Sequence, residues 1–322
     1  MSDALILSED QLRARIALDE TAIDVIEAAF ATLAQGGVRM PPILSMHLPD
    51  RNAELDVKTA YVPGLSGFAV KISPGFFDNP ARGLPSTSGL MVVLSRETGR
   101  VRAVLLDNGY LTDVRTAAAG GVAARHLSRP ESSRAAIFGA GLQARMQLQA
   151  LRLVRPISQA VIWARDAARA QRLAADLGGD GLQVRAEPDP ERAAASADII
   201  VTTTPASQPI LRADWLRPGQ HITAMGSDQP GKNELDPHCL SRADLYVADR
   251  LSQTRILGEL RAALAAGTAP EPAATAELGQ IIAGQRPGRR SPDQITIADL
   301  TGTGVQDTAI ATHALAAFSD EA

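Results

Sequence analysis

The stretch Ala135-Ala136-Ile137-Phe138-Gly139-Ala140-Gly141-Leu142-Gln143-Ala144 decides the fold of this chain. Its apolar start is typical of a buried strand, and the turn pattern G-x-G-x-x-A leads directly into the helical pattern LQARMQLQALRLV. Gly139 permits a tight turn, Gly141 lets the backbone approach a pyrophosphate, and Ala144 allows the helix to pack closely on the strand. Free N–H groups at the start of the helix can then bind phosphates. The stretch predicts a dinucleotide site, with a plain tight turn as the alternative.

Strands and helices alternate on the carboxyl side of this turn. The runs QAVIWA, ADIIVTTT, HITAMGS and ADLYVAD predict strands, and the run DAARAQRLAADL predicts a further helix. This alternation is typical of an α/β fold with a doubly wound parallel sheet of Rossmann type. We place this dinucleotide-binding domain at residues 126–303.

The two ends of the chain follow a different pattern. Residues 8–33 predict one helix, and four short β-rich runs within 41–107 predict an antiparallel or mixed sheet. Residues 112–126 and 304–318 predict further helices. We therefore predict a second, α+β domain built from residues 1–125 together with 304–322.

The composition narrows the class of protein. The 322 residues fit two domains of roughly 100–200 residues each. A net charge of −4 argues against a nucleic-acid partner, and 3% aromatic residues argue against stacking on single strands. No apolar run reaches the ~20 residues of a membrane span and the start lacks a secretory signal, so we expect a cytoplasmic protein without a membrane partner. The single Cys239 excludes an internal disulfide, and the five histidines form no metal-binding array, so we expect no metal.

The choice of cofactor depends on the end of the next strand. Ala164 stands where an NAD-selecting carboxylate is expected, and Arg165 can bind the 2′-phosphate of NADP. Asp166 can bind the ribose hydroxyls or merely cap the next helix. We therefore favour NADP slightly over NAD. Thr202 and Thr203 end a later strand and can line the cofactor, or serve only as β-branched strand residues.

Charged residues stand at unusual places in the rest of the sequence. Arg39, Lys71 and Arg115 lie in largely apolar or small-residue contexts, and together they can hold a carboxylate. Alternatively, Lys71 extends to solvent from its strand. Asp228 lies in a Gly-rich loop after a strand, where it can exchange a proton with a substrate or act only as a turn former.

Several motifs in a fixed order make the chain similar to the ornithine cyclodeaminase/mu-crystallin family over nearly its whole length. They are Arg39-Met40-Pro41, Lys71, Leu84-Pro85-Ser86, Glu97-Thr98-Gly99, Leu111-Thr112-Asp113-Val114-Arg115-Thr116-Ala117-Ala118, the glycine turn at 139–144 and Gly226-Ser227-Asp228-Gln229-Pro230-Gly231-Lys232-Asn233-Glu234-Leu235. The resemblance implies a substrate-binding and dimerisation domain, a Rossmann domain and a homodimer.

The resemblance also implies roles for individual residues. Arg39, Lys71 and Arg115 would hold the α-carboxylate of a small amino or imino acid, and Thr301 would face the same cleft. Asp228 would be the catalytic acid/base, with Lys71 as a second catalytic candidate. The implied contacts to the nucleotide are Ser86, Arg115, Thr116, Gly139, Ala140, Gly141, Leu142, Gln143, Met225, Gly226, Ser227, Asp228 and Lys232.

One stretch departs from the family pattern. Ornithine cyclodeaminases share a Glu-Leu-Met-Pro string whose Glu binds the distal amine, whereas this chain has Asp56-Val57-Lys58-Thr59. Lys58 suits a second carboxylate better than an ammonium group. The stretch resembles members encoded for ectoine utilisation and hydroxyaspartate breakdown, which implies an iminosuccinate reductase. The alternative is that Lys58 points to solvent.

Three functions follow from these observations. The leading one is an NAD(P)H-dependent imino acid reductase, or L-amino acid dehydrogenase, that converts iminosuccinate to aspartate. The second is a cyclodeaminase that oxidises an amino acid, closes a ring and releases ammonia. The third, from another class, is an NADP-dependent small-ligand binding protein, which the retained Asp228 and cations disfavour because a binder needs no proton relay.

Overall fold

The computed structural model describes residues 4–319, which divide into two compact units. Unit 1 extends up to residue 115 and resumes at 303, and unit 2 spans residues 116–302. The division falls within helix α3 (Tyr110–Leu127). The predicted domain boundaries, 125/126 and 303/304, stay a prediction. None of the helices described is long and apolar enough to cross a bilayer.

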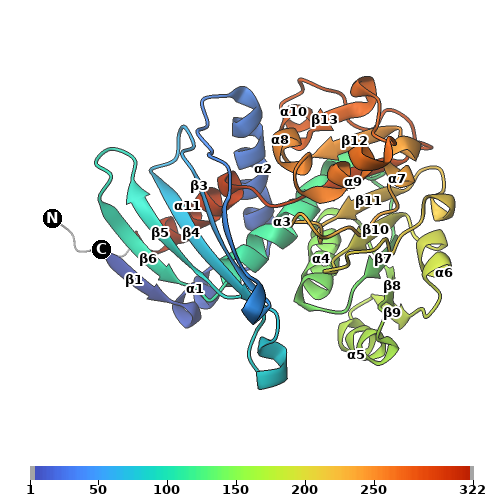
Figure 1. The fold of residues 1–322 in the computed structure, drawn as a ribbon, viewed down its shortest axis with the longest axis horizontal. Coiled ribbons are helices and arrows are strands. Elements are labelled where there is room, and N and C mark those ends of the chain that lie inside the picture. Colours follow the sequence, from blue (N-terminus) through green and yellow to red (C-terminus); the bar gives the residue numbers. More distant parts are fainter. Residues whose placement is uncertain (1–3, 320–322) are drawn as a thin grey trace. The chain divides into compact units, whose positions relative to one another are not determined.

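Six strands form the sheet of unit 1, in the order β1-β6-β5-β4-β3-β2 (Figure 1). β1 pairs with β6 in parallel and the other neighbours are antiparallel, so the sheet is mixed, as predicted. The strands are β1 (Leu5–Ser8), β2 (Leu44–Leu48), β3 (Ala53–Ala60), β4 (Gly67–Phe76), β5 (Leu90–Ser95) and β6 (Val101–Leu106), with short 3₁₀ turns η1 (Pro49–Arg51) and η2 (Asn79–Arg82).

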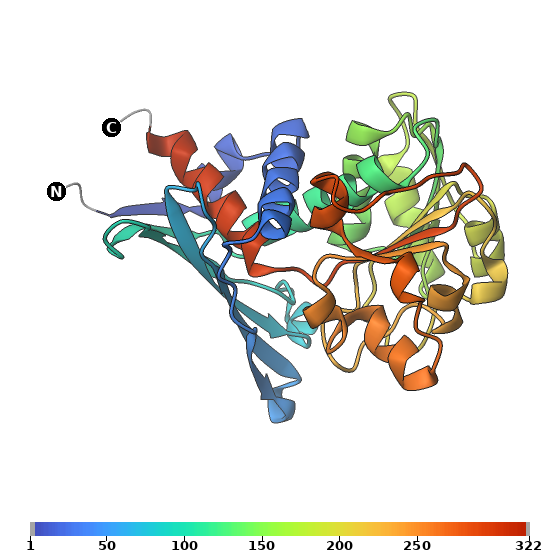
Figure 2. The ribbon, with the colours of Figure 1, turned by 90° about the horizontal axis from the view of Figure 1, so that it is seen from above.

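Helices cover one face of this sheet. Helix α11 (Gly304–Ser319) packs across β3 and β4 and lies beside α2 (Glu20–Gln35) (Figure 2). Because side chains alternate along a strand, every second residue of β3–β6 points into this core, including Ala60, Ala69 and Met91. The opposite face keeps apolar side chains such as Leu44 and Met46 exposed.

The single helix predicted over residues 8–33 is wrong, because α1 (Glu9–Arg15) and α2 are separate helices. The side chain of Ser8 accepts a hydrogen bond from the backbone N–H of Gln11, and that of Asp19 accepts one from Ala22. Ile16 is extended and ends α1. Two N-cap residues in one periodic stretch therefore start two helices.

Unit 2 contains an eight-stranded parallel sheet in the order β13-β12-β14-β11-β10-β7-β8-β9, which confirms the doubly wound prediction. The order reverses between β7 and β10, and sheets of this kind bind ligands at the carboxyl ends of the strands there. The strands are β7 (Arg134–Phe138), β8 (Gln159–Trp163), β9 (Gln183–Ala186), β10 (Ile199–Thr202), β11 (His221–Ala224), β12 (Leu245–Ala248), β13 (Thr275–Glu277) and β14 (Thr296–Asp299).

Helices on both faces bury the central strands of unit 2. One core packs Ala135, Ile137 and Ile162 against α4 and α5, and another packs Phe138 and Ile222 on the other face. The helices are α4 (Leu142–Val154), α5 (Ala167–Leu177), α6 (Pro190–Ala195), α7 (His238–Arg242), α8 (Leu251–Thr254), α9 (Gly258–Ala266) and α10 (Leu278–Ile282), with η3 (Ala213–Trp215) and η4 (Pro272–Ala274).

Candidate active site

The glycine turn joins the carboxyl end of β7 to the start of α4. Gly139 has a φ of 140°, and a Cβ built on it would lie 2.3 Å from the Thr203 hydroxyl oxygen. Its N–H donates to the Trp163 carbonyl at 2.8 Å, which fixes the turn against β8. Only glycine fits here without moving the end of β10.

The start of α4 has the features of a phosphate site. Its N-cap, Gly141, makes no side-chain bond to the helix, and the space around its Cβ position is open. An anion there meets backbone N–H groups and the positive end of a 13-residue helix. Leu142 is exposed beside the turn, Gln143 is half-buried, and Ala144 packs into the core. The turn thus fits a dinucleotide pyrophosphate.

Asp166, at the end of β8, caps the next helix. One oxygen of its carboxylate accepts hydrogen bonds from the backbone N–H groups of Ala168 and Arg169, at 3.0 and 3.1 Å. This is one of the two roles considered for Asp166, and its contact with the ribose hydroxyls stays a prediction. Arg165 is exposed and has no ion pair within residues 4–319.

The loop after β11 carries the predicted acid/base. The Asp228 side chain is 44% exposed, and one of its oxygens lies 2.6 Å from the Lys232 ammonium nitrogen. Lys232, predicted to contact the nucleotide, thus holds the Asp228 carboxylate in place. Gly226 is required nearby, because a Cβ on it would lie 2.0 Å from the Thr204 carbonyl oxygen.

Two buried glutamates that are not among the predicted site residues anchor this loop. Glu234 accepts hydrogen bonds from the Gly226 N–H and the Thr202 hydroxyl, each at 2.7 Å. Glu259 accepts from the Ser227 hydroxyl and from the Glu234 N–H. Burial, aided by the nearby Glu259, raises the pKa of Glu234 to about 7. These hydrogen bonds therefore hold the loop both before Asp228, at Gly226 and Ser227, and after it, at Glu234.

Three predicted ligand contacts have their hydroxyls engaged inside unit 2. Thr202 donates to Glu234, and Ser227 donates to Glu259. Thr301 donates to Asp249 at 3.1 Å and accepts from a Gln253 amide at 2.7 Å. All three residues are buried, and their hydroxyls support the neighbouring loops. A hydroxyl that donates its proton can still accept a hydrogen bond, so the direct ligand contacts of these residues stay predictions.

A cluster of charges lies in the core of unit 1. Lys58 and Lys71 are directly opposite each other on β3 and β4, so their side chains share a face. One oxygen of Asp307, on α11, lies 3.0 Å from the Lys71 Nζ and 3.0 Å from the Arg115 Nε. All four residues are buried, so the alternative that Lys58 or Lys71 points to solvent is wrong.

Burial and neighbouring charges perturb this cluster strongly. Burial, reinforced by repulsion from Arg115 and Lys58, lowers the pKa of Lys71 to about 7, and Asp307 opposes that fall. Burial would raise the pKa of Asp307, but the three cations outweigh it and hold the pKa below its usual range. The cluster thus has more positive than negative charge, as a receptor for anions requires.

The remaining predicted residues of unit 1 are more peripheral. Arg39 is exposed; its backbone pairs with Tyr61, and no side-chain contact within residues 4–319 joins it to Lys71 or Arg115. Asp56 is buried two residues before Lys58, on the same face, and accepts a hydrogen bond from Ser45 at 2.6 Å. Ser86 is half-buried in the loop before β5. Thr116, the first residue of unit 2, is half-buried in α3.

The lysines themselves are a signal that the motif analysis missed. The chain contains 32 lysines and arginines, and only Lys58, Lys71 and Lys232 are lysines. Two lie in the charge cluster of unit 1 and the third is paired with Asp228. Arginine stays charged in proteins, whereas lysine can lose its proton when buried. Lysine occurs only in the charge cluster and in the Asp228 loop.

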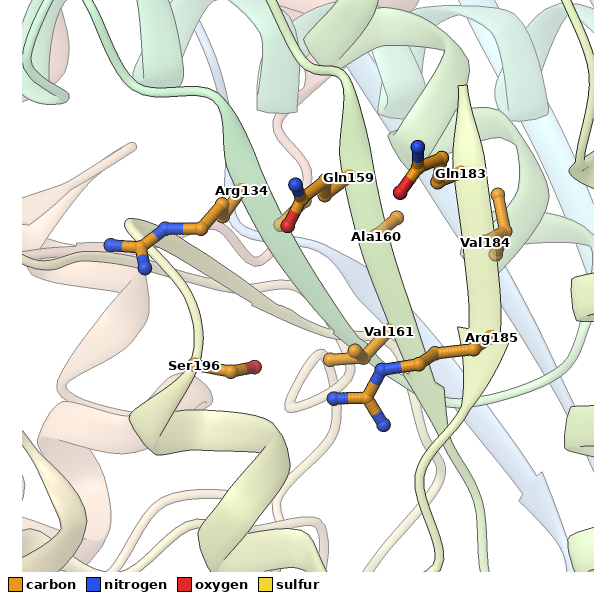
Figure 3. A pocket seen from close by; sticks show the side chains of 9 residues that line it. Arg134, Gln159, Ala160, Val161, Gln183, Val184, Arg185 and Ser196 are labelled. Atoms are coloured by element: carbon orange, nitrogen blue, oxygen red, sulfur yellow. The ribbon is translucent and has the colours of Figure 1, made fainter. Parts of the chain in front are cut away.

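A separate pocket of about 250 Å³ opens at the amino ends of β7, β8 and β9 (Figure 3). The side chains of Arg134 and Arg185 line it and form ion pairs with Asp198 and Glu187. The glycine turn lies at the other end of β7, so this pocket is not the predicted dinucleotide site.

The sequence of the chain matches the family model for ornithine cyclodeaminase/mu-crystallin over residues 2–320. The chain belongs to this family. The roles expected for its glycine turn, for Asp228 and for the cations of the charge cluster stay predictions.

Several relatives in this family align over almost the whole chain. A putative dehydrogenase of Rhizobium meliloti is 63% identical over 98% of this chain and 96% of its own. An alanine dehydrogenase of Archaeoglobus fulgidus is 37% identical, covering 96% and 93%. An iminosuccinate reductase of Paracoccus denitrificans is 31% identical, covering 95% and 94%.

Solved structures in the ornithine cyclodeaminase/mu-crystallin family share the fold. An archaeal alanine dehydrogenase dimer with bound NAD superposes with a TM-score of 0.92 at 34% identity, covering 99% of this chain and 97% of that one. The Δ¹-pyrroline-2-carboxylate reductase of Thermococcus litoralis, in complex with NADH and L-proline, has a TM-score of 0.93 at 28% identity, covering 98% of each chain.

Proposed function

We propose that this protein is an NAD(P)-dependent imino acid reductase, or in the reverse direction an L-amino acid dehydrogenase. The observation that supports this most is the buried cluster of Lys58, Lys71 and Arg115 around one carboxylate in unit 1. Such an excess of buried positive charge suits a substrate carboxylate. The glycine turn and the Asp228 loop of unit 2 supply the second requirement, a dinucleotide and a proton.

NAD(P)H, when bound, supplies a hydride from its nicotinamide ring. Lys71 and Arg115 hold the carboxylate and orient the carbon that accepts this hydride. Asp228 moves a proton at the substrate nitrogen. Lys232 keeps the Asp228 carboxylate aligned, and Glu234 and Glu259 keep the loop in one conformation. Lys71, whose amine nitrogen lies 3.0 Å from an Asp307 oxygen, stays the second catalytic candidate.

Within this class we propose iminosuccinate as the substrate and aspartate as the product. Iminosuccinate has two carboxylates, and the cluster brings three buried cations, Lys58, Lys71 and Arg115, close to the single carboxylate of Asp307. Lys58 lies directly beside Lys71 and supplies the extra charge. Arg39, which lies next to β3, stays a proposed contact to the substrate carboxylate.

We propose that the protein binds NADP somewhat better than NAD. Asp166 is committed to capping α5, so its carboxylate is already engaged by two backbone N–H groups. Arg165 is exposed next to it and can pair with a 2′-phosphate. The dissociation constants of NADP and NAD for the wild-type protein test this preference directly. A lower dissociation constant for NAD would contradict it.

We also propose a homodimer that forms through the open face of the sheet in unit 1. Rows of apolar side chains cross this face in register, for example Leu44–Val57–Ile72 and Val70–Val92–Val104. Leu44, Met46 and Ile6 are 61%, 48% and 68% exposed. A monomer rarely leaves such a patch in water, and a second copy buries it symmetrically.

A cyclodeaminase is the second candidate, and Asp56 favours it. This buried carboxylate lies on the substrate-facing side of β3 and can hold a distal amine. A ligand-binding protein without catalysis is the third candidate. The tight Asp228–Lys232 pair argues against it, since binding alone needs no aligned proton carrier.

A turnover screen tests the proposal. NAD(P)H absorbance is followed with iminosuccinate, with pyruvate plus ammonia, and with ornithine. Net oxidation of the cofactor with an imine supports the reductase. Ammonia release from ornithine without net cofactor consumption supports the cyclodeaminase, and no turnover on any of these supports the binding protein.

A further inference from the structure

Asp307 is a carboxylate at the centre of the charge cluster that no sequence motif pointed to. It is fully buried on α11, and one oxygen contacts both Lys71 and Arg115 at 3.0 Å. Its other oxygen, also buried, has no hydrogen-bond partner in residues 4–319. A buried carboxylate depends on nearby cations to compensate its charge, and Asp307 has two in direct contact and Lys58 close by.

Both cations and carboxylates surround Lys71 and influence its protonation. Lys58 faces it from β3, Arg115 from α3 and Asp307 from α11, while its opposite neighbour on β5, Met91, is apolar. Asp107, in the turn before α3, interacts with it at longer range, and burial raises the pKa of Asp107 to about 6. Asp307 is the acidic side chain that touches the Lys71 amine directly.

The scarcity of lysine gives an independent reason to look at this amine. All but three of the 32 basic residues are arginine, yet two lysines lie side by side here. Desolvation and a neighbouring cation both favour loss of the proton from a buried lysine such as Lys71. A carboxylate in contact opposes this loss, typically by one to three pKa units, that is by roughly 10–1,000-fold in proton affinity.

We propose that Asp307 is a positioning residue that keeps Lys71 protonated and, together with Arg115, aimed at the substrate carboxylate. The inference rests on the proposed function for its consequence in catalysis, but not for its effect on the lysine. Asp307 determines the pH above which the protein stops binding anionic substrates. Because Lys71 is charged only below its pKa, removing the Asp307 charge moves that limit to lower pH.

A neighbour of Asp307 provides a matched structural control. The Thr308 hydroxyl accepts a hydrogen bond from the Ala69 N–H at 3.0 Å and donates one to the Ala60 carbonyl at 2.8 Å. It therefore fastens the same turn of α11 to the same two strands without any charge. Thr308→Val weakens the packing of α11 but leaves the electrostatics of Lys71 as they are.

The experiment titrates the lysines directly. With three lysines in the chain, protein labelled with ¹³C-lysine gives three side-chain signals, which Lys58→Met and Lys232→Met assign. We expect Asp307→Asn to lower the titration midpoint of Lys71 by at least about one pH unit. Asp307→Glu, which keeps the charge, and Thr308→Val should leave it within about 0.3 unit. Asp307→Ser is measured as a second neutral variant, so that one of the two is available if the other does not fold. An unchanged midpoint in the neutral variants that fold overturns the proposal.

The pH profile of kcat/KM for the best substrate is the second readout. In Asp307→Asn the fall of kcat/KM on the alkaline side should begin at lower pH. Thr308→Val should change only the maximum value of kcat/KM and leave the pH of this fall unchanged. A lysine shift without this change in the profile overturns the catalytic part of the inference. If the wild-type protein turns over no imino or amino acid, the proposed function fails, and the lysine titration still decides the role of Asp307.

Discussion

At the scale of single residues, Asp228 keeps almost half of its side chain exposed while Lys232 holds one of its oxygens. An exposed carboxylate with a fixed orientation is suited to moving a proton. The sequence motif predicted Asp228 correctly as a loop residue at a strand end, but its partner could not be inferred. Nothing in the motif distinguishes a lysine that contacts the nucleotide from one that aligns the acid.

Asp228→Asn should reduce turnover by roughly 10²–10⁴-fold, because the amide cannot exchange a proton. The dissociation constant for NAD(P)H should stay within about threefold, since the loop is held by Glu234 and Glu259. Steady-state kinetics and cofactor titration measure the two effects. Asp236→Asn is the matched control, because the Asp236 carboxylate accepts from His238 and from the Ala213 backbone and belongs to none of the predicted site residues. Turnover near the wild-type value would remove Asp228 from the mechanism.

Lys58→Met tests the second carboxylate. The variant should lower kcat/KM for iminosuccinate by roughly 10–100-fold, as expected when a charged hydrogen bond worth about 1.5–3 kcal/mol is lost. Reductive amination of pyruvate, which has no second carboxylate, should hardly change and serves as the internal control. Equal losses on both substrates would show that Lys58 serves the shared carboxylate. A gain of ornithine turnover would show that Asp56 binds an amine.

At the scale of elements, short sequence patterns predicted the strands and turns whose formation depends on neighbouring residues. Period-two runs gave β3–β6, and the glycine turn gave the β7–α4 connection. The break between α1 and α2 was missed, although Asp19 is a capping residue that could have signalled it. Asp307 and Glu259 were missed for a different reason. Each acts on residues far along the chain, Lys71 in one case and Ser227 in the other, and no spacing rule connects such distant positions.

Two glycines of the Asp228 loop should differ in their tolerance of alanine. Gly226→Ala places a Cβ against the Thr204 carbonyl and the Glu234 carboxylate, so the loop must move. We expect a loss of about 2–4 kcal/mol in the free energy of unfolding and a large loss of activity. Gly231→Ala meets nothing within 4 Å and should behave like the wild type. Denaturant unfolding and kinetics measure both, and a stable, active Gly226→Ala variant would contradict the anchoring of this loop.

At the scale of the whole molecule, each unit contributes a different chemical ability. Unit 1 concentrates buried positive charge beneath one helix, and unit 2 presents a phosphate-binding turn and an aligned acid at the carboxyl ends of its strands. The sequence predicted both folds, because strands and helices alternate regularly in unit 2 and four short β-rich runs indicate the mixed sheet of unit 1. Whether two copies of the chain associate depends on their exposed surfaces, and sequence patterns describe such surfaces poorly.

The proposed dimer makes a prediction about the open sheet face. Met46→Lys combined with Val92→Lys places two charges in the apolar rows, so the protein should become monomeric at concentrations where the wild type is a dimer. Light scattering after size exclusion measures the mass. Leu264→Lys changes an exposed apolar residue of α9 in unit 2 and should leave the mass unchanged. A monomeric wild type would rule out this dimer.

The three lysines have a practical consequence for anyone who handles this protein. Reagents that acylate or carbamylate amines find hardly any side-chain target outside the charge cluster and the Asp228 loop. Lys58 and Lys71 are buried, whereas the Lys232 side chain is 20% exposed, so coupling through lysine amines would attach the folded molecule by the Asp228 loop. Conversely, peptide mapping of an acetylated sample shows whether a bound ligand protects Lys232.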